Sequence, residues 1–408
     1  MSWGLTGNNR TTTPYDFYSQ IATLPGNQGS FDYVFGGKPI AGYYPSNMAN
    51  DKLKWETTEQ YNAGMDLAFI DNRIKFTGDV YLKNTYDLLL AATIPASSGY
   101  TTEMLNIGSM QNKGLELTLD LVPVRTRDFE WSFNFNIGIN RNKVTALTDN
   151  QYSLLRSVSW DQQYNSQNPY ITQVGRPSGM MYGFIYDGTY RISDFTDAGI
   201  LKDGIPYMTS VGRSNVRPGD PKYRDINEDG EVNDDDRTII GCGQPLHTGG
   251  FGSNFTWRGF DLGFFFSWSY GNDVLNANRL IFENGTKLNL NQFRSYEGRF
   301  NKETAPASDI PRVNANGMAV YSSRVIESGS FLRLRSVTLG YNLPPRALRR
   351  IHASSLRFYV SGENLLTFTS YSGPDPEVST RNSVLTPGFD WSAYPRAFGL
   401  TAGMNVSF

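Results

Sequence analysis

The sequence predicts an all-β protein, an antiparallel transmembrane β-barrel of which this chain forms an open half-barrel of about ten strands. Three observations lead to this fold class. Apolar and polar residues alternate over segments that are long enough to cross a bilayer. Short turns and long irregular segments alternate between these strands. No apolar run approaches the roughly 18 residues of a transmembrane helix, which excludes a helical membrane protein.

The clearest alternation lies in residues 397–408. One parity is apolar from Phe398 to Phe408, and the other parity is small or polar. A period of two is that of a β-strand with one apolar face. A soluble protein rarely ends on such a strand, because an exposed apolar edge strand promotes aggregation. In a barrel the apolar face meets lipid and the polar face meets the lumen.

The same alternation recurs upstream, for example in Leu115, Leu117, Leu119 and Leu121. A β-sandwich also alternates, but its strands are usually about 5–6 residues long, and these segments are longer. Besides a short first strand near Ser2–Thr6, the sequence predicts strands over about 54–70, 73–90, 112–123, 129–146, 249–258, 260–271, 330–342, 355–364 and 395–408. We expect these strands to pair in sequence order, with their apolar parities facing outward.

The connections between the strands follow a barrel pattern. Short turns are expected at about 71–72, 123–128, 258–259 and 344–355. Long irregular segments, expected to be extracellular, cover about 9–52, 91–110, 148–246, 272–328 and 365–393. Tight turns at one end and long loops at the other are typical of outer-membrane barrels.

Composition and charge exclude other classes. The formal net charge is −2, so the whole chain lacks the excess positive charge that is typical of nucleic-acid-binding proteins. The single cysteine, Cys242, permits no internal disulfide and no zinc site built on several thiolates. The residues after Met1 do not form the signal peptide that an outer-membrane protein needs. We therefore expect residues 1–408 to be the C-terminal part of a larger barrel.

Several segments, in order along nearly the whole chain, resemble the SusC/RagA family of TonB-dependent outer-membrane transporters. The longest is Ser361–Val378, which reads SGENLLTFTSYSGPDPEV, and a second is Pro218–Gly230, which reads PGDPKYRDINEDG. The others are Leu53–Thr58, Asn106–Glu116, Tyr182–Gly188 and Tyr394–Phe398. We interpret these residues as structural signatures of the family rather than as ligand contacts.

The resemblance implies a barrel of about 22 strands with an N-terminal plug, and the plug has no counterpart in this chain. It implies TonB-dependent import of oligosaccharides or peptides across the outer membrane of a Gram-negative bacterium, and no enzymatic activity. The implied partners are a SusD-like surface lipoprotein, the TonB–ExbB–ExbD complex acting through the missing N-terminal region, outer-membrane lipid, and a glycan or peptide substrate. Two alternatives stay open: an outer-membrane hydrolase barrel and a soluble β-rich surface interaction protein.

A calcium-type loop is the sharpest chemical motif. Six of its residues occupy ligand positions of an EF-hand loop, and Gly230 stands at the turn position; the six are Asp225, Asn227, Asp229, Glu231, Asn233 and Asp236. Ca²⁺ takes six to eight oxygen ligands, which this spacing supplies. The last position holds Asp rather than Glu, and no amphipathic helix precedes the loop. The alternative is a solvated acidic turn whose side chains cap their own backbone.

Aromatic residues in the long segments are candidates for substrate contact, because aromatic faces stack on sugar rings or peptide side chains. We select Trp160, Tyr164 and Trp391. The alternative is that they pack the loops or lie at the membrane interface. The two histidines, His247 and His352, have no neighbouring serine motif, which argues against a catalytic pair.

Overall fold

The computed structural model describes residues 1–408 except 10–14, 16, 24–32, 41, 95, 101, 148–150, 288, 350–351 and 381–382. The long segments predicted at 9–52, 91–110, 148–246, 272–328 and 365–393 each include some of these positions. For those positions the prediction lies outside the described residues.

One antiparallel sheet dominates the structure, and we call its ten strands the wall. The wall strands are β1 (Ser2–Asn8), β6 (Glu56–Phe69), β7 (Ile74–Tyr86), β10 (Ser109–Arg125), β11 (Phe129–Ala146), β20 (His247–Trp257), β21 (Phe260–Tyr270), β24 (Phe331–Asn342), β25 (Ser355–Thr369) and β27 (Gly399–Ser407). Their order in the sheet is their order in the sequence. Every predicted strand is therefore confirmed, with ends that differ by a few residues.

An apolar band crosses the wall from strand to strand because the register aligns the apolar parities. Leu119 lies opposite Phe76 on one side and Phe135 on the other. The band continues in the pairs Phe135–Phe251, Phe251–Phe266, Phe264–Val337, Leu339–Val360 and Val360–Ala402. Many of its large side chains are exposed. An exposed apolar band of this kind is the lipid-facing surface of an outer-membrane barrel.

A β-bulge at Arg335 keeps the band continuous where the sequence parity changes. The register between β21 and β24 shifts between Phe265 and Phe266. As a result, Leu334 before the bulge and Val337 after it both belong to the apolar face, although their numbers differ in parity. A bulge leaves one residue unpaired and redirects the side chains around it. Here it places Arg335 on the polar face, where its Nε donates to Ser267 Oγ at 2.7 Å.

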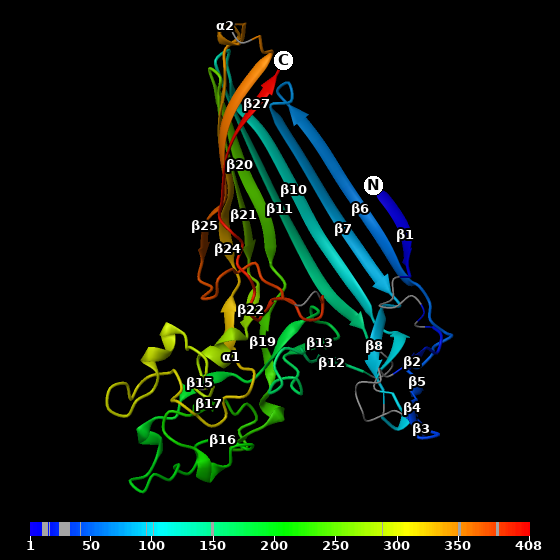
Figure 1. Cartoon of the computed structure of the whole chain (residues 1–408), viewed down its shortest axis with the longest axis vertical. Coiled ribbons are helices and arrows are strands. Elements are labelled where there is room, and N and C mark those ends of the chain that lie inside the picture. The colour runs from blue at the N-terminus through cyan, green and yellow to red at the C-terminus, as the bar shows by residue number, and fades with distance from the viewer. Residues whose placement is uncertain are drawn as a thin grey trace.

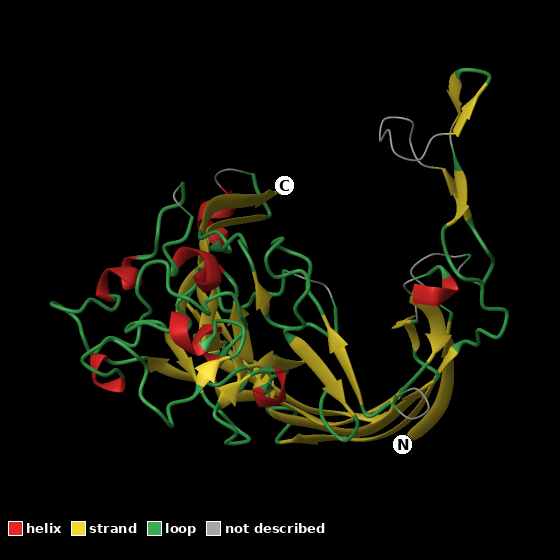
Figure 2. Ribbon diagram, turned by 90° about the horizontal axis from the view of Figure 1, so that it is seen from below, coloured by secondary structure: helices red, strands yellow, loops and turns green. Residues whose placement is uncertain are grey.

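The wall is open. β1 pairs only with β6, and β27 pairs only with β25, so among the described residues these two strands are the free edges of the sheet. Figure 2 shows the strands curving into a trough whose ends, near the two termini, are far apart. This confirms the expected open half-barrel.

The two ends of the wall differ, as predicted. At one end the connections are short, and the longest of them carries the helix α2 (Pro345–Leu348). At the other end the long connections gather (Figure 1). We call the connections 147–246, 271–330 and 370–398 together the cap. No helix among the described residues is long and apolar enough to cross a membrane.

The long connections contain short elements rather than irregular chain alone. Outside the cap these are β2 (Ile21–Thr23), β3 (Tyr33–Phe35), β4 (Lys38–Ile40), β5 (Tyr43–Pro45), β8 (Leu89–Thr93), β9 (Thr102–Asn106) and the 3₁₀ turn η1 (Ala96–Ser98). The cap strands are β12 (Ser153–Arg156), β13 (Tyr170–Gln173), β14 (Met180–Gly183), β15 (Tyr186–Thr189), β16 (Tyr207–Met208), β17 (Pro221–Tyr223), β18 (Glu231–Val232), β19 (Thr238–Cys242), β22 (Asp273–Asn276), β23 (Ile326–Ser328) and β26 (Phe389–Asp390). The cap helices are α1 (Asn278–Phe282) and the 3₁₀ turns η2 (Ile192–Asp194), η3 (Arg213–Asn215), η4 (Asp234–Asp236), η5 (Arg294–Gly298) and η6 (Ser323–Val325).

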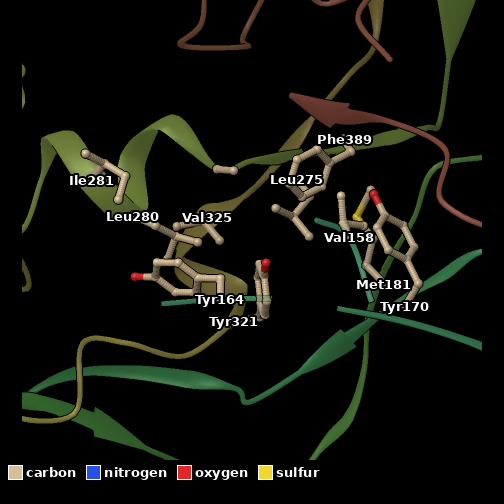
Figure 3. Packing of buried hydrophobic residues seen from close by; sticks show 11 residues of the cluster. Val158, Tyr164, Tyr170, Met181, Leu275, Leu280, Ile281, Tyr321, Val325 and Phe389 are labelled. Carbon is tan, nitrogen blue, oxygen red and sulfur yellow. The ribbon is translucent and has the colours of Figure 1, made fainter. Parts of the chain in front are cut away.

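The cap has hydrophobic cores of its own. The largest draws on all three connections, and Figure 3 shows Tyr164, Tyr321, Leu275 and Phe389 among its members. Two smaller clusters lie within or beside the first connection. Because residues more than 200 positions apart bury one another here, the three connections fold as one packed body.

We predict that charge is tolerated on one face of the wall and not on the other. Leu117 lies in the middle of β10 on the apolar face, and Thr118 follows it on the polar face. In the intact barrel, Leu117→Arg should lower the free energy of unfolding by about 2–4 kcal/mol, the cost of arginine on a lipid face near the bilayer midplane. Thr118→Arg should cost far less.

Urea titration of the barrel in lipid vesicles, followed by heat-modifiable gel migration, measures both variants. Equal losses for Leu117→Arg and Thr118→Arg would contradict the assignment of the faces.

Candidate functional site

The three aromatic residues selected from the sequence lie together in the cap. The Trp160 ring stacks on Tyr164 at 5.0 Å between centroids and lies 4.5 Å from the Trp391 ring. Trp160 Nε1 also donates to the Tyr321 hydroxyl at 2.7 Å. Tyr164 is fully enclosed, whereas Trp160 and Trp391 are half-buried at the edge of the same core. All three residues therefore take part in loop packing, and substrate contact by Trp160, Tyr164 and Trp391 stays a prediction.

The acidic loop is organised by its own side chains. The Asp225 carboxylate accepts the backbone N–H groups of Glu228 and Gly230, both at 2.7 Å. The Asp236 side chain is fully buried and accepts the N–H groups of Ile226 at 2.7 Å and Asn233 at 2.9 Å. These bonds close the loop at both ends, and the pairing of Glu231 and Val232 with Tyr207 and Met208 joins the loop to the rest of the first connection.

The other ligand positions are engaged as well, and the Glu231 carboxylate accepts from the Tyr207 hydroxyl at 2.8 Å. Asp229 accepts from the backbone N–H of Glu231 at 2.8 Å, and Asn233 accepts from that of Asp235 at 2.8 Å. Asn227 donates to the Asp229 carboxylate at 2.9 Å. Within the described part of the chain, no group of three or more His, Cys, Asp and Glu side chains is arranged to hold a metal ion. The donor set is still made of hard oxygens, which suit Ca²⁺, so calcium binding stays a prediction.

The two histidines lie in different environments. His247 Nδ1 accepts from Trp268 Nε1 at 3.0 Å, and the imidazole stacks on the Tyr270 ring at 5.0 Å. His352 lies in the short connection between β24 and β25, at the opposite end of the wall from the cap. The two histidines therefore do not share a site.

A feature that the motifs did not indicate is a cleft of about 900 Å³ in the cap, which we call the cap cleft. It is lined by residues of two connections: Gln163, Tyr164, Met208, Ser210, Val211, Asn215, Arg217, Pro218, Asn284, Thr286, Lys302, Arg312 and Ala315–Val320. A volume in this range is typical of small-molecule sites. The cap cleft is the candidate functional site of the described residues.

Asp220, which belongs to the resemblance segment Pro218–Gly230, joins two segments that line the cap cleft. Its buried carboxylate forms an ion pair with Arg312 Nε at 2.8 Å and accepts the N–H of Arg217 at 2.9 Å. It also accepts the N–H of Asn316 at 3.1 Å. Burial raises the pKa of this carboxyl, and the Arg312 guanidinium opposes that rise. The side chain therefore acts as a structural tie between segments that are 96 positions apart.

Glycine is required beside this tie. Gly219 has a φ of 85°, in the left-handed region that favours glycine. A Cβ at this position would lie 2.3 Å from Cδ1 of Phe300, so a side chain would collide with the aromatic ring as well. The backbone turn therefore requires glycine at position 219, and the next residue, Asp220, supplies the buried carboxylate.

The longest resemblance segment has a structural role of the same kind. The segment Ser361–Val378 includes the end of β25 and continues over the polar face of the wall, where Asp375 and Glu377 lie. Arg333 is almost fully buried and pairs with Asp375 at 2.5 Å and with Glu377 at 3.1 Å. Glu377 also pairs with Arg335 at 2.7 Å. This ion cluster anchors the third connection of the cap to the inner face of the wall.

Comparisons with known proteins match the chain over most of its length. The family described as "TonB dependent receptor-like, beta-barrel" matches residues 7–365. TonB-dependent receptor P3 of Formosa agariphila is 32% identical over 412 residues, which cover 100% of this chain and 39% of the relative. TonB-dependent receptor SusC of Bacteroides thetaiotaomicron is 26% identical over 419 residues, which cover 100% of this chain and 37% of SusC.

Solved structures agree on the fold. The RagAB peptide transporter superposes with a TM-score of 0.77 at 23% identity, covering 100% of this chain and 40% of the matched chain. The chain thus spans about two fifths of the length of the relatives that it matches. These relatives are receptors and transporters, which agrees with the expectation that the chain is not an enzyme.

We predict that Asp220→Ala loosens the cap cleft. The substitution leaves Arg312 without its partner, and loss of hydrogen bonds to a charged group should destabilise the cap by about 2–3 kcal/mol. Hydrogen exchange and limited proteolysis of the intact protein should show faster opening of residues 209–219 and 312–318. The matched control is Asp203→Ala, because Asp203 pairs with Arg213 on the exposed surface. Unchanged protection in Asp220→Ala would refute the tie.

We also predict calcium binding by the acidic loop. Isothermal titration of the intact protein with CaCl₂ should give a weak site, with a dissociation constant of about 10⁻⁴–10⁻³ M, because Asp236 has a short side chain and no helix pair organises the loop. Asp225→Ala should remove this site, and Asp235→Ala, outside the ligand positions, should keep it. If wild type and Asp225→Ala take up Ca²⁺ equally, the loop is only an acidic turn.

Proposed function

Because this chain belongs to the family of TonB-dependent receptors, we propose that the intact protein imports oligosaccharides or peptides across the bacterial outer membrane. The proposal places the chain in the outer membrane as part of a larger barrel. The remaining strands and the plug would come from sequence outside residues 1–408. Import would draw its energy from the TonB–ExbB–ExbD complex through that missing region.

The observation that carries the proposal is the match of this whole chain to part of SusC, supported by the fold likeness to the RagAB peptide transporter. Both matches cover 100% of this chain. The physical features of the chain are consistent with it. The wall has a lipid-facing apolar band, and the cap has hydrophobic cores of its own.

We further propose a SusD-like surface lipoprotein as the partner that covers the cap. The fold likeness to RagAB, together with the match to SusC, supports this partner. The cap is also suited to a docking role, because its own cores hold it in one shape before a partner binds. Prior order lowers the entropic cost of association.

The test is uptake by cells that depend on the intact receptor. Labelled oligosaccharides or peptides should enter the periplasm in cells with functional TonB and remain outside when TonB is inactivated. Receptor abundance in the outer membrane should be equal in the two strains. Uptake that survives loss of TonB would overturn the proposal. Hydrolysis of the label by the purified receptor would favour the hydrolase alternative instead.

A further inference from the structure

We propose that the cap cleft binds an anionic oligosaccharide through its carboxylate or sulfate groups. This inference rests on the proposed import function and adds the chemical class of the substrate. It starts from the charges that line the cleft. Arg217, Lys302 and Arg312 all contribute to the lining, and no aspartate or glutamate does so among the described residues.

The cationic character is local, since the whole chain has a formal net charge of −2. Asp220 lies behind Arg312 and balances one of the three positive charges. Within the part of the chain that the structure describes, neither Arg217 nor Lys302 forms an ion pair. The Arg217 guanidinium donates instead to the backbone carbonyls of Ser214 at 2.7 Å and Val216 at 2.8 Å. Those bonds fix the position of its charge without neutralising it.

Two exposed cationic side chains without carboxylate partners favour an anionic ligand, because a cleft lined by one sign of charge attracts the opposite sign. Arginine in particular matches the geometry of carboxylate and sulfate oxygens. The exposed Lys302 adds a charge at the rim. Neutral ligands gain no charge–charge attraction from this arrangement, so the charge pattern is a basis for selecting anionic ligands.

The uncharged lining favours a saccharide over a peptide. Side-chain amides of Gln163, Asn215 and Asn316 and the hydroxyl of Ser210 line the cleft. Amides and hydroxyls offer both donors and acceptors, which suits the hydroxyl groups of a sugar ring. A peptide carries an N-terminal ammonium group besides its carboxylates, and this cleft offers that ammonium group no carboxylate partner, whereas an acidic oligosaccharide of uronic or sulfated sugars has no cationic group.

The lining of the cap cleft is already ordered before a ligand binds. Asp220 ties the Arg217 and Asn316 segments together, so both segments are placed by a buried group rather than by the ligand. Asn316 Nδ2 also donates to the backbone carbonyl of Asn215 at 2.9 Å. Preformed sites of this kind lose less entropy on binding. Arg312 serves chiefly as the partner of Asp220, and Arg217 and Lys302 are the residues assigned to the anionic groups.

The test is isothermal titration of the intact, detergent-purified receptor with tetragalacturonate and with its methyl ester, which has the same rings but no charge. A sulfated tetrasaccharide distinguishes sulfate from carboxylate recognition, and tetraglutamate represents an acidic peptide. We expect saturable binding of tetragalacturonate or the sulfated tetrasaccharide, weakening as salt rises from about 50 mM to about 500 mM. The ester should bind at least about tenfold more weakly.

The variant Arg217→Gln/Lys302→Gln should weaken binding of the acidic saccharide about tenfold and reduce its salt dependence. Both residues are exposed, so the cap should remain folded. The matched control is Lys202→Gln, an exposed cation of the same connection that does not line the cleft. It should bind like wild type.

The inference is overturned if acid and ester bind equally, if the double variant binds like wild type, if tetraglutamate binds more tightly than either saccharide, or if neither acidic saccharide binds. TonB-dependent uptake of a neutral or peptide substrate, unaffected by the double variant, would remove this inference and leave the import function standing. Charge-selective binding without TonB-dependent uptake would support this inference and overturn the import function.

Discussion

The structure depends on one constraint, which is that a strand in a bilayer must pair every backbone polar group with a neighbour while showing lipid an apolar face. The wall meets both demands through its register. Leu117 lies opposite Ile137, and Phe251 lies opposite Phe266, so pairing the backbones also aligns the apolar side chains. A slip of one residue would send a whole apolar row to the polar face. The bulge at Arg335 illustrates the same constraint, since it restores the band where the sequence parity changes.

The cap follows from the wall. Antiparallel strands in sequence order bring alternate connections to the same end, so three long segments meet there without any signal of their own. Once together, they bury residues such as Tyr170, Leu275 and Phe389 in one core. Ion pairs then join the cap to the wall, as Arg333 does with Asp375. The cap cleft lies between two of these segments, so its shape depends indirectly on the order of the strands.

The sequence was sufficient to predict the wall because alternation is a local signal, contained in each strand. It also placed the short and long connections correctly. It did not indicate the cap cleft, because Arg217 and Asn316 belong to connections separated by two wall strands and are brought together only by the fold, in part through Asp220. The aromatic residues show the same limit. Trp160 and Trp391 were selected as aromatic residues of two separate long segments, and their contact across 231 positions arises from the fold. The acidic loop is intermediate, since its motif and the hydrogen bonds of Asp225 are local, whereas the bond from Tyr207 to Glu231 arises from the fold.

The central claim is that alternate residues of each wall strand face lipid. The most direct measurement is spin-label accessibility along β11 of the intact receptor in lipid vesicles, with labels placed one at a time from Trp131 to Ile139. Collisions with oxygen, which concentrates in lipid, should peak at Phe133, Phe135 and Ile137. Collisions with a water-soluble nickel chelate should peak at the residues between them. A profile without a period of two, or one with oxygen maxima at Asn134 and Asn136, would contradict the account.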